Sequence, residues 1–379
     1  MNTENYTEKC LDLLKHLISI NTVNPPGQEL AAAEYLRLFL EPYGFKCHVQ
    51  EVEEGRANLV AEYGEEGTEL IFNGHLDVVP VTDNWATDPF TMVEKNEKIY
   101  ARGSADMKGG VAAMCIAAIT AAEQGLVRKG RLKLVFVADE ECSNLGTHAY
   151  FSQYGRCKEN TKVIIGEPTN LKVNVAHRGV SRDYITILGS SRHAGLPWRK
   201  DDPVSCAASA IQVLDGLNEY FQAVKHEILP VPSISVTMLE AYEKDNIAPG
   251  KVKMLTDCRI LPGMTQQEIE NLIRKTLEKT GIHFEIAPHF YMPGGALSIH
   301  NEMVHTCNKI IETVLQQEAE PVAFPASCEQ CFWIENGADA LILGPGDIKQ
   351  AHTDNEYVKK QQLSQAVEIY RQIITSYLQ

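Results

Sequence analysis

The chain has 379 residues, in which 50 Asp and Glu outweigh 35 Lys and Arg to give a formal net charge of −15. Such a chain lacks the basic face that nucleic acids and anionic membrane surfaces require, so we expect neither as a partner. The length exceeds what one ordinary hydrophobic core organises, and with the acidic charge it predicts a soluble cytoplasmic protein of two domains.

The N-terminal region is predicted to form two helices and two strands. Leu14, Leu17 and Ile18 recur at helical spacing with charged residues between them, which indicates an amphipathic helix and not the continuous apolar centre of a signal peptide. An Asn-Pro-Pro-Gly breaker separates this helix from the next. The predicted elements are helices over 8–20 and 28–41 and strands over 46–52 and 57–63.

The next stretch holds the first polar groups that are ill suited to a core. The apolar run over 69–73 predicts a buried strand, which opens onto His75 and Asp77. After a short strand predicted over 99–104, Asp106 precedes a pair of glycines that lets a helix of small residues pack close to a sheet. This helix holds about a dozen apolar residues, whereas a membrane span needs about 20.

Three further apolar strands end in polar residues in the same way. They lead to Glu140 and Glu141, to Glu167, and to His352. Helices intervene, which predicts an α/β fold with a mixed, mostly parallel sheet flanked by helices. In such sheets ligands bind at the carboxyl ends of the strands, so these side chains are expected at one edge. A final helix over 360–378 places one apolar face inward, formed by Leu363, Val367, Tyr370, Ile373 and Ile374.

The pattern changes between residues 179 and 292. Strands and helices follow there in the order βαββαβ, with a helix over 203–219 and a second one that starts at Thr265 with Glu268 as its capping-box partner. This order is typical of a small ferredoxin-like α+β domain. We therefore predict a main domain formed by 1–178 and 293–379, with 179–292 inserted into it.

The residues at the strand ends match the chemistry of a metal site. His75, Asp106, Glu141, Glu167 and His352 exceed the ligands of one tetrahedral zinc, but they fit two ions that share one carboxylate. Asp106 is central in the set and is the best candidate for the bridge. Asp77 can orient the ring of His75. Glu140 stays free as a general base, because neighbours on an extended strand end point opposite ways.

Each of these residues also has a simpler interpretation. A single His-x-Asp is common by chance, and the Glu140–Glu141 pair alone would be a solvated strand end. Glu167 before a proline can be a turn residue, and His352 a surface histidine. Their joint occurrence after four apolar strands favours the metal site. The ten cysteines show no framework spacing, so Cys328 and Cys331 are expected to be core or pocket-wall thiols.

The chain resembles the M20 family of zinc-dependent amidohydrolases, which includes acetylornithine deacetylase, succinyl-diaminopimelate desuccinylase and carboxypeptidase G2. The matching segments span almost the whole chain: GHLDVVP (74–80), YARGSADMKGG (100–110), ADEE (138–141), IIGEPT (164–169), SRHAGLP (191–197), NIAPG (246–250), DCRILPGMT (257–265) and GPGDIKQAHTDNEY (344–357). Within the family, four of these segments look most similar to acetylornithine deacetylases: ADMKG (105–109), IIGEPT (164–169), LPGMT (261–265) and the segment 344–357.

The resemblance implies a zinc-exopeptidase-like catalytic domain with two Zn²⁺, for which Co²⁺ or Mn²⁺ can substitute. It places His75, Asp106 and Glu167 on one zinc and Asp106, Glu141 and His352 on the other, with a cis bond from Asp106 to Met107. Asp77 would orient His75, and Glu140 would be the general base.

The resemblance also assigns roles to the inserted domain, which it implies to be a lid and a dimerisation domain. His193 matches a histidine that acts in the partner's site of a homodimer. Arg178, Asn246 and Arg259 match positions that bind the substrate carboxylate. Without the family, His193 would read as a surface histidine and Arg259 as a solvated strand residue.

The implied function is hydrolysis of an N-acyl amino acid, with N-acetylornithine or a close analogue as substrate. The alternatives are a desuccinylase or dipeptidase of the same family, or a small-molecule binder that kept the fold without catalysis. The segment from Ala326 to Cys331 departs from the deacetylase pattern, so Glu329 could either meet a basic substrate side chain or be structural. No nucleophile elbow, phosphate-binding loop or His-Glu-x-x-His helix is present in the sequence.

Overall fold

The computed structural model describes residues 3–197 and 199–379. These residues divide into two compact units. Unit 1 comprises Met1–Val175, Leu297–Phe324 and Cys328–Gln379, and unit 2 comprises Ala176–Ala296 and Pro325–Ser327. The predicted insertion, 179–292, lies within unit 2.

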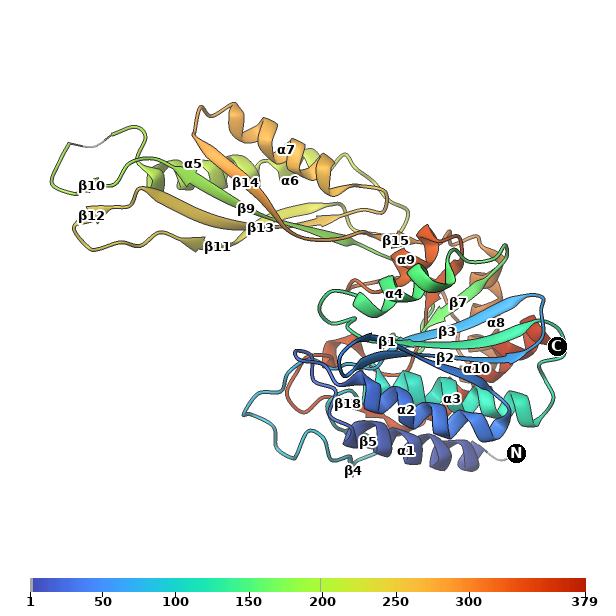
Figure 1. The fold of residues 1–379 in the computed structure, drawn as a ribbon. Coiled ribbons are helices and arrows are strands. Elements are labelled where there is room, and N and C mark those ends of the chain that lie inside the picture. The colour runs from blue at the N-terminus through green and yellow to red at the C-terminus, as the bar shows by residue number, and fades with distance from the viewer. Residues whose placement is uncertain (1–2, 198) are drawn as a thin grey trace. The chain divides into compact units, whose positions relative to one another are not determined.

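The framework of unit 1 is a mixed sheet, which Figure 1 shows among its helices. Within the described residues nine strands form this sheet, in the order β1-β2-β6-β3-β7-β17-β8-β15, with β16 paired to β8. Their bounds are β1 Lys46–Glu53, β2 Arg56–Gly64, β3 Glu69–His75, β6 Arg131–Val137, β7 Lys162–Ile165, β8 Asn174–His177, β15 Gly295–Ala296, β16 Val322–Phe324 and β17 Asp339–Ile342.

The centre of this sheet is parallel. β3 runs parallel to β6 and to β7, and β17 runs parallel to β7, whereas β1 and β2 add antiparallel strands at one side. Every residue of β3 is buried, as expected for a strand that is covered on both faces. The four apolar strands singled out in the sequence are therefore the parallel core, and the predicted fold class is confirmed.

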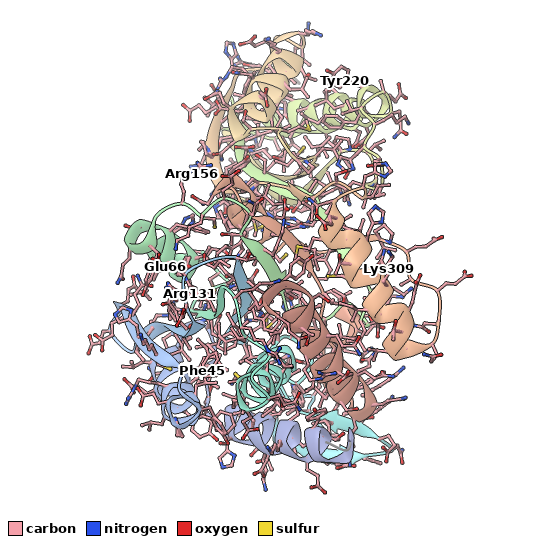
Figure 2. All side chains as sticks on the ribbon, turned by 90° about the vertical axis from the view of Figure 1, so that its right-hand side faces the viewer. Phe45, Glu66, Arg131, Arg156, Tyr220 and Lys309 are labelled. Carbon is pink, nitrogen blue, oxygen red and sulfur yellow. The ribbon has the colours of Figure 1, made fainter. Side chains whose placement is uncertain are left out.

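Helices cover both faces of the sheet. α1, α2 and α3 lie on one face and α4 on the other (Figure 1). The helices of unit 1 are α1 Thr3–Ser19, α2 Glu29–Leu40, α3 Lys108–Glu123, α4 Leu145–Tyr154, α8 Glu302–Leu315, α9 Gln330–Glu335 and α10 Lys360–Leu378, with short 3-10 turns η1 Glu41–Tyr43 and η2 Ile348–Gln350. Side chains fill the space between helices and sheet, while Lys309 lies on the exposed side of α8 (Figure 2).

The small residues of α3 have the predicted consequence. From Lys108 to Ala121 this helix is fully buried, and it packs against α1 and α10. A Cβ atom on Gly110 would lie 2.3 Å from the carbonyl oxygen of Gly166, so only glycine permits this approach. The apolar face predicted for α10 is buried as well.

One predicted strand is shorter than expected. The run over 99–104 forms a strand only as β5 Lys98–Tyr100, which lies between β4 Val93–Lys95 and β18 Tyr357–Lys359 in a small separate sheet. The chain then turns instead of extending, because the backbone N–H groups of Gly103, Ala105 and Asp106 all donate to the carboxylate of Glu356.

Unit 2 has the predicted ferredoxin-like fold. Its elements are β9 Gly179–Leu188, β10 Arg192–His193, α5 Pro203–Asp215, α6 Leu217–Phe221, β11 Ser233–Glu240, β12 Ile247–Ala248, β13 Lys251–Ile260, α7 Gln266–Glu278 and β14 Phe284–Met292. The main strands form an antiparallel sheet in the order β11-β13-β9-β14, and β10 pairs with β12. The helix predicted over 203–219 is broken at Gly216 into α5 and α6. Thr265 and Glu268 form the predicted capping box of α7.

A buried carboxyl group in β9 gives unit 2 a pH-dependent stability. Asp183 is fully buried, its Oδ2 accepts from Ser181 at 3.3 Å, and its Oδ1 has no hydrogen-bond partner. Burial raises the pKa of Asp183 from 3.8 to about 6, and the charge of Glu270 adds to the rise. A raised carboxyl pKa favours folding at low pH, and this contribution is lost as the pH rises through about 6.

We therefore expect Asp183→Asn to raise the melting temperature above pH 6, where the charged form is removed. The advantage should shrink as the pH falls toward 3.8, because Asp183 is then neutral in both folded and unfolded chains. Thermal melts of the two proteins at pH 4.5 and pH 8 measure the difference. An equal shift at both pH values would contradict this origin.

All ten cysteines lie in the described part of the chain and are free thiols. Cys328 and Cys331 are 0% and 1% exposed, as expected for core thiols. Among the described residues, no helix combines the length and the apolar character needed to cross a membrane.

Candidate metal centre

The parallel strands deliver the predicted ligands to one edge of the unit 1 sheet. His75 is the last residue of β3, Glu141 follows β6 and Glu167 follows β7. His352 comes from the loop after β17, and Asp106 precedes α3. Because parallel strands end at the same edge, residues far apart in the sequence meet there.

The first group of possible ligands is His75, Asp106 and Glu167. One donor atom from each residue lies within 4.8 Å of the others, and all three residues are buried. His75 Nε2 is 3.1 Å from Asp106 Oδ1 and 3.5 Å from Glu167 Oε1. Three donors at this spacing can surround one ion.

The second group is Asp106, Glu141 and His352, whose donor atoms also lie within 4.8 Å of one another. His352 Nε2 is 3.0 Å from Glu141 Oε2 and 3.4 Å from Asp106 Oδ2. The side chain of His352 is 55% exposed, so this half of the centre is open to solvent.

Asp106 belongs to both groups. Its Oδ1 faces His75 and its Oδ2 faces His352, which is the arrangement of a carboxylate that bridges two cations. The peptide bond from Asp106 to Met107 is cis, as the resemblance implies. The sequence patterns therefore identified a set of residues that the fold brings together as two adjoining groups.

The charges of the centre fit divalent cations. Burial raises the pKa of Glu167 well above its ordinary value, and the neighbouring charge of Asp106 raises it further. Burial would also raise the pKa of Asp106, but hydrogen bonds with His352 and His75 hold it below its ordinary value. Carboxylates crowded in a buried site are stabilised by a cation, and a set of imidazole and carboxylate donors suits zinc and similar ions.

Asp77 connects the two halves of the centre, but in a different way from the one expected. His75 Nδ1 lies 2.9 Å from the backbone carbonyl oxygen of Asp77 and 3.6 Å from its carboxylate, so the carbonyl takes the direct hydrogen bond. The carboxylate instead accepts the backbone N–H groups of Glu140 and Glu141, each at 3.2 Å. Asp77 thereby fixes the turn that carries both glutamates.

Glu140 lies beside the ligand groups and belongs to neither of them. Burial raises the pKa of its carboxyl group, the charge of His75 opposes this rise, and the charges of Glu141 and Glu329 add to it. A carboxylate held next to a metal centre without coordinating it has the position required of a general base.

One residue to which the sequence assigned no role, Glu356, supports the centre. The buried carboxylate of Glu356 accepts the N–H groups of Ala105 at 2.8 Å and Asp106 at 3.0 Å, and Arg102 Nη1 donates to it at 2.7 Å. Burial raises the pKa of Glu356 to about 7. Glu356 lies in the segment 344–357, one of the segments that match the family. The resemblance itself assigned no role to this residue.

Glu329, for which the sequence left two roles open, is 0% exposed. Thr147 Oγ1 donates to its Oε1 at 2.6 Å, and burial raises the pKa of Glu329 to about 7. A carboxyl group enclosed in this way favours the structural interpretation over contact with a basic substrate side chain.

The remaining predicted residues lie in unit 2, in two separate pairs. His193 and Asn246 meet where β10 pairs with β12, and the N–H of Ala194 donates to the carbonyl oxygen of Asn246 at 2.9 Å. Arg178 and Arg259 lie at the other end of β9, where the positive charge of Arg259 adds to burial in lowering the pKa of Arg178.

Comparison with known proteins agrees with this geometry. The model of peptidase family M20/M25/M40 matches residues 71–376. The chain belongs to this family. As a member of it, the protein is a hydrolytic enzyme of the metallopeptidase and amidohydrolase type.

Two relatives align with almost the whole length of this M20 protein. An acetylornithine deacetylase of Proteus mirabilis is 29% identical over 383 residues, covering 97% of this chain and 96% of its own. A probable succinyl-diaminopimelate desuccinylase of Staphylococcus epidermidis is 26% identical over 404 residues, covering 97% of both.

A solved structure shares the fold of this M20 protein. The YxeP protein of Bacillus subtilis, described as a dinuclear metal-binding peptidase of the M20 family, superposes with a TM-score of 0.76. It is 15% identical and covers 99% of each chain. This similarity confirms the fold, including a mostly parallel sheet with flanking helices.

Proposed function

We propose that the protein is a cytoplasmic di-zinc deacylase that hydrolyses the amide bond of N-acetylornithine or a close analogue, releasing a carboxylic acid and a free amino acid. The observation that carries this proposal is the pair of ligand groups that share Asp106, with Glu140 held beside them. The names of the relatives favour an acylated amino acid as substrate. Ten free thiols suit a reducing compartment.

Each functional residue has a separate role in the proposed hydrolysis. When bound, two cations lower the pKa of a water molecule and polarise the amide carbonyl. Glu140 accepts the proton of this water as it attacks and then delivers the proton to the leaving amine. Asp77 keeps Glu140 in place by accepting its backbone N–H. His193 donates to the carbonyl oxygen as negative charge develops on it, and such a donor contributes about 2.7–4 kcal/mol.

The length of β9 supports an active homodimer. Arg178 precedes this strand, which spans Gly179–Leu188, and His193 follows it. Ten extended residues cover about 33 Å, so the two arginines and the histidine cannot reach one small substrate from the same chain. If Arg178, Arg259 and Asn246 bind the substrate carboxylate and His193 acts on the same molecule, some of them must come from a second subunit.

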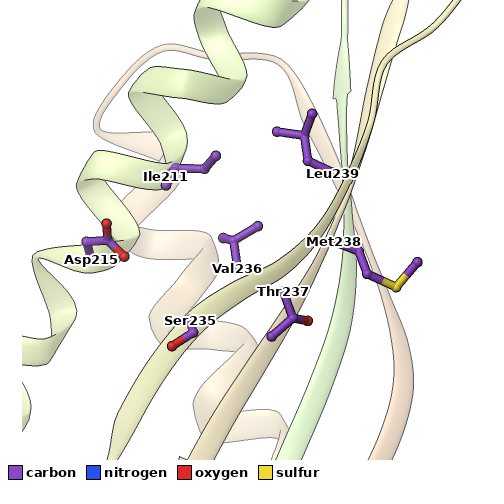
Figure 3. A pocket seen from close by; sticks show the side chains of 7 residues that line it. All are labelled: Ile211, Asp215, Ser235, Val236, Thr237, Met238 and Leu239. Carbon is purple, nitrogen blue, oxygen red and sulfur yellow. The ribbon is translucent and has the colours of Figure 1, made fainter.

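The surface of unit 2 offers a place for this second subunit. β11 is the outer strand of its sheet and exposes Met238 at 47% and Leu239 at 48%. Figure 3 shows the groove between this strand and α5, lined by Ile211 and Asp215 on the helix side. An exposed apolar edge strand is a ready partner for another strand, which here favours a second copy of the chain.

We expect His352→Ala to lose one metal ion per chain while keeping the other. The first ligand group does not include His352, whereas the second loses its imidazole and keeps only carboxylates. Atomic absorption on protein dialysed against metal-free buffer measures the content. His305→Ala, at an exposed position of α8, is the matched control. Loss of both ions, or of neither, would contradict two separate ligand groups.

A panel of substrates on zinc-loaded protein tests the proposed function. The panel pairs N-acetylornithine with other N-acetyl amino acids, succinyl-diaminopimelate and dipeptides, and measures kcat/KM for each. Preference for acetyl amino acids supports the proposal, and preference for succinyl or peptide substrates supports the desuccinylase or dipeptidase alternative. Absence of turnover throughout the panel, with both ions bound, would favour a non-catalytic relative.

A further inference from the structure

The segment before α2 forms part of the wall behind the metal centre. Thr22 Oγ1 donates to the carbonyl oxygen of Leu76 at 2.7 Å, and the N–H of Asn24 donates to the carbonyl oxygen of Val78 at 2.9 Å. The segment therefore runs alongside the loop that carries Asp77. Asn24 is 3% exposed, so its side chain points into the protein and not toward solvent.

The amide group of Asn24 joins two buried carboxylates. Its Nδ2 donates to Asp77 Oδ2 at 2.8 Å and to Asp139 Oδ1 at 2.9 Å. Because carboxylates only accept hydrogen bonds, both contacts require the NH₂ side of the amide, and its two hydrogens are thereby used. Among uncharged side chains of this size, only asparagine carries two donor hydrogens on one nitrogen.

Asp139 is itself anchored by further partners, one of them on the same oxygen that accepts from Asn24. Arg56 Nη1 lies 2.8 Å from Asp139 Oδ1, and the same guanidinium donates to Glu29 through Nε at 3.0 Å and through Nη2. The other oxygen of Asp139 accepts the N–H of Ser143 at 3.1 Å. Glu29, Arg56, Asp139 and Asn24 thus form one continuous buried chain of charge-assisted hydrogen bonds that ends on Asp77.

We propose that Asn24 is a positioning residue for the metal centre, acting through Asp77 and held in place by Asp139 and Arg56. Asp77 provides the carbonyl for His75 Nδ1 and accepts the N–H groups of Glu140 and Glu141, so a shift of Asp77 displaces a ligand and the base together. Partners behind metal ligands commonly change metal affinity by about 10- to 100-fold. This inference rests on the proposed two-ion centre but not on the substrate.

The test is a zinc titration of metal-free protein in competition with a chromophoric chelator. Asn24→Ala is expected to raise at least one of the two zinc dissociation constants by about 10- to 100-fold. Asn24→Asp keeps the shape but replaces two donors by a third negative charge, so its loss should be at least as large. Asn271→Ala changes the same residue type at an exposed position of α7, outside this segment, and its affinities should equal those of the unchanged chain.

Two measurements separate positioning from a general effect on folding. The melting temperature of the metal-free variants reports the fold alone, and Asn24→Asp decides the question if Asn24→Ala does not fold. Unchanged zinc affinities in a folded Asn24 variant would overturn the proposal. So would an equal loss of both ions that only parallels a lower metal-free melting temperature. Zinc binding without turnover of any acyl amino acid would refute the proposed function and leave this inference intact.

Discussion

Glu140→Ala is expected to retain both zinc ions and to lose turnover by about 10²- to 10⁴-fold, the usual contribution of a general base. Glu140 is not a member of either ligand group, so its removal leaves the donors of both ions in place. Its carboxylate nevertheless lies close enough to Glu141 and His75 for their charges to act on its pKa. Metal content and kcat measured on the same preparation separate the two effects.

Glu66→Ala is the matched control, because Glu66 is an exposed glutamate in the loop after β2. This loop lies at the edge of the sheet where β6 begins, whereas Glu141 follows the end of β6. This variant should keep the activity and the metal content of the unchanged chain. A folded Glu140→Ala protein with full metal and undiminished kcat would exclude Glu140 as the base. Loss of one zinc in that variant would instead make Glu140 a ligand.

The second large effect concerns the proposed homodimer. His193→Ala and Glu140→Ala are each expected to be nearly inactive as pure proteins. In a mixed dimer, the subunit that keeps Glu140 receives the intact His193 of its partner, so one complete site forms. Equal co-expression gives about half mixed dimers with one of two sites intact, hence about a quarter of the normal activity.

Differently tagged chains allow the mixed dimers to be purified away from the parents. Activity near half that of the unchanged dimer in this fraction supports a histidine that acts across the interface. No recovery would mean that His193 acts within its own chain, because neither site would then hold both residues. Light scattering on the same fraction confirms that the subunits are paired.

Much of the metal centre could be predicted because it depends on regular structure. Each of the strands β3, β6, β7 and β17 is an apolar run with a clear end, and parallel strands bring those ends together whatever the sequence between them. The ferredoxin-like insertion was predictable for the same reason, since every one of its main elements carries its own periodic pattern.

What could not be predicted lies in contacts that have no local pattern. Asn24 and Arg56 reach Asp139 from a coil and from an antiparallel strand, and nothing in the spacing of these residues indicates that they meet. α9 has six residues, which is too short to show a helical period. α4 begins after Asn144 in a left-handed conformation, without a side-chain cap to mark its start.

The positions at which the inserted domain joins the rest of the chain affect how that domain could be replaced. Ala176 pairs with Ala296 across β8 and β15, and the N–H of Leu297 donates to the carbonyl oxygen of Val175 at 2.8 Å. The two segments that border the insertion are therefore neighbouring antiparallel strands. A short hairpin joining these two strands would replace the continuous insertion and leave the strands that carry the candidate metal ligands in their order and with their neighbours.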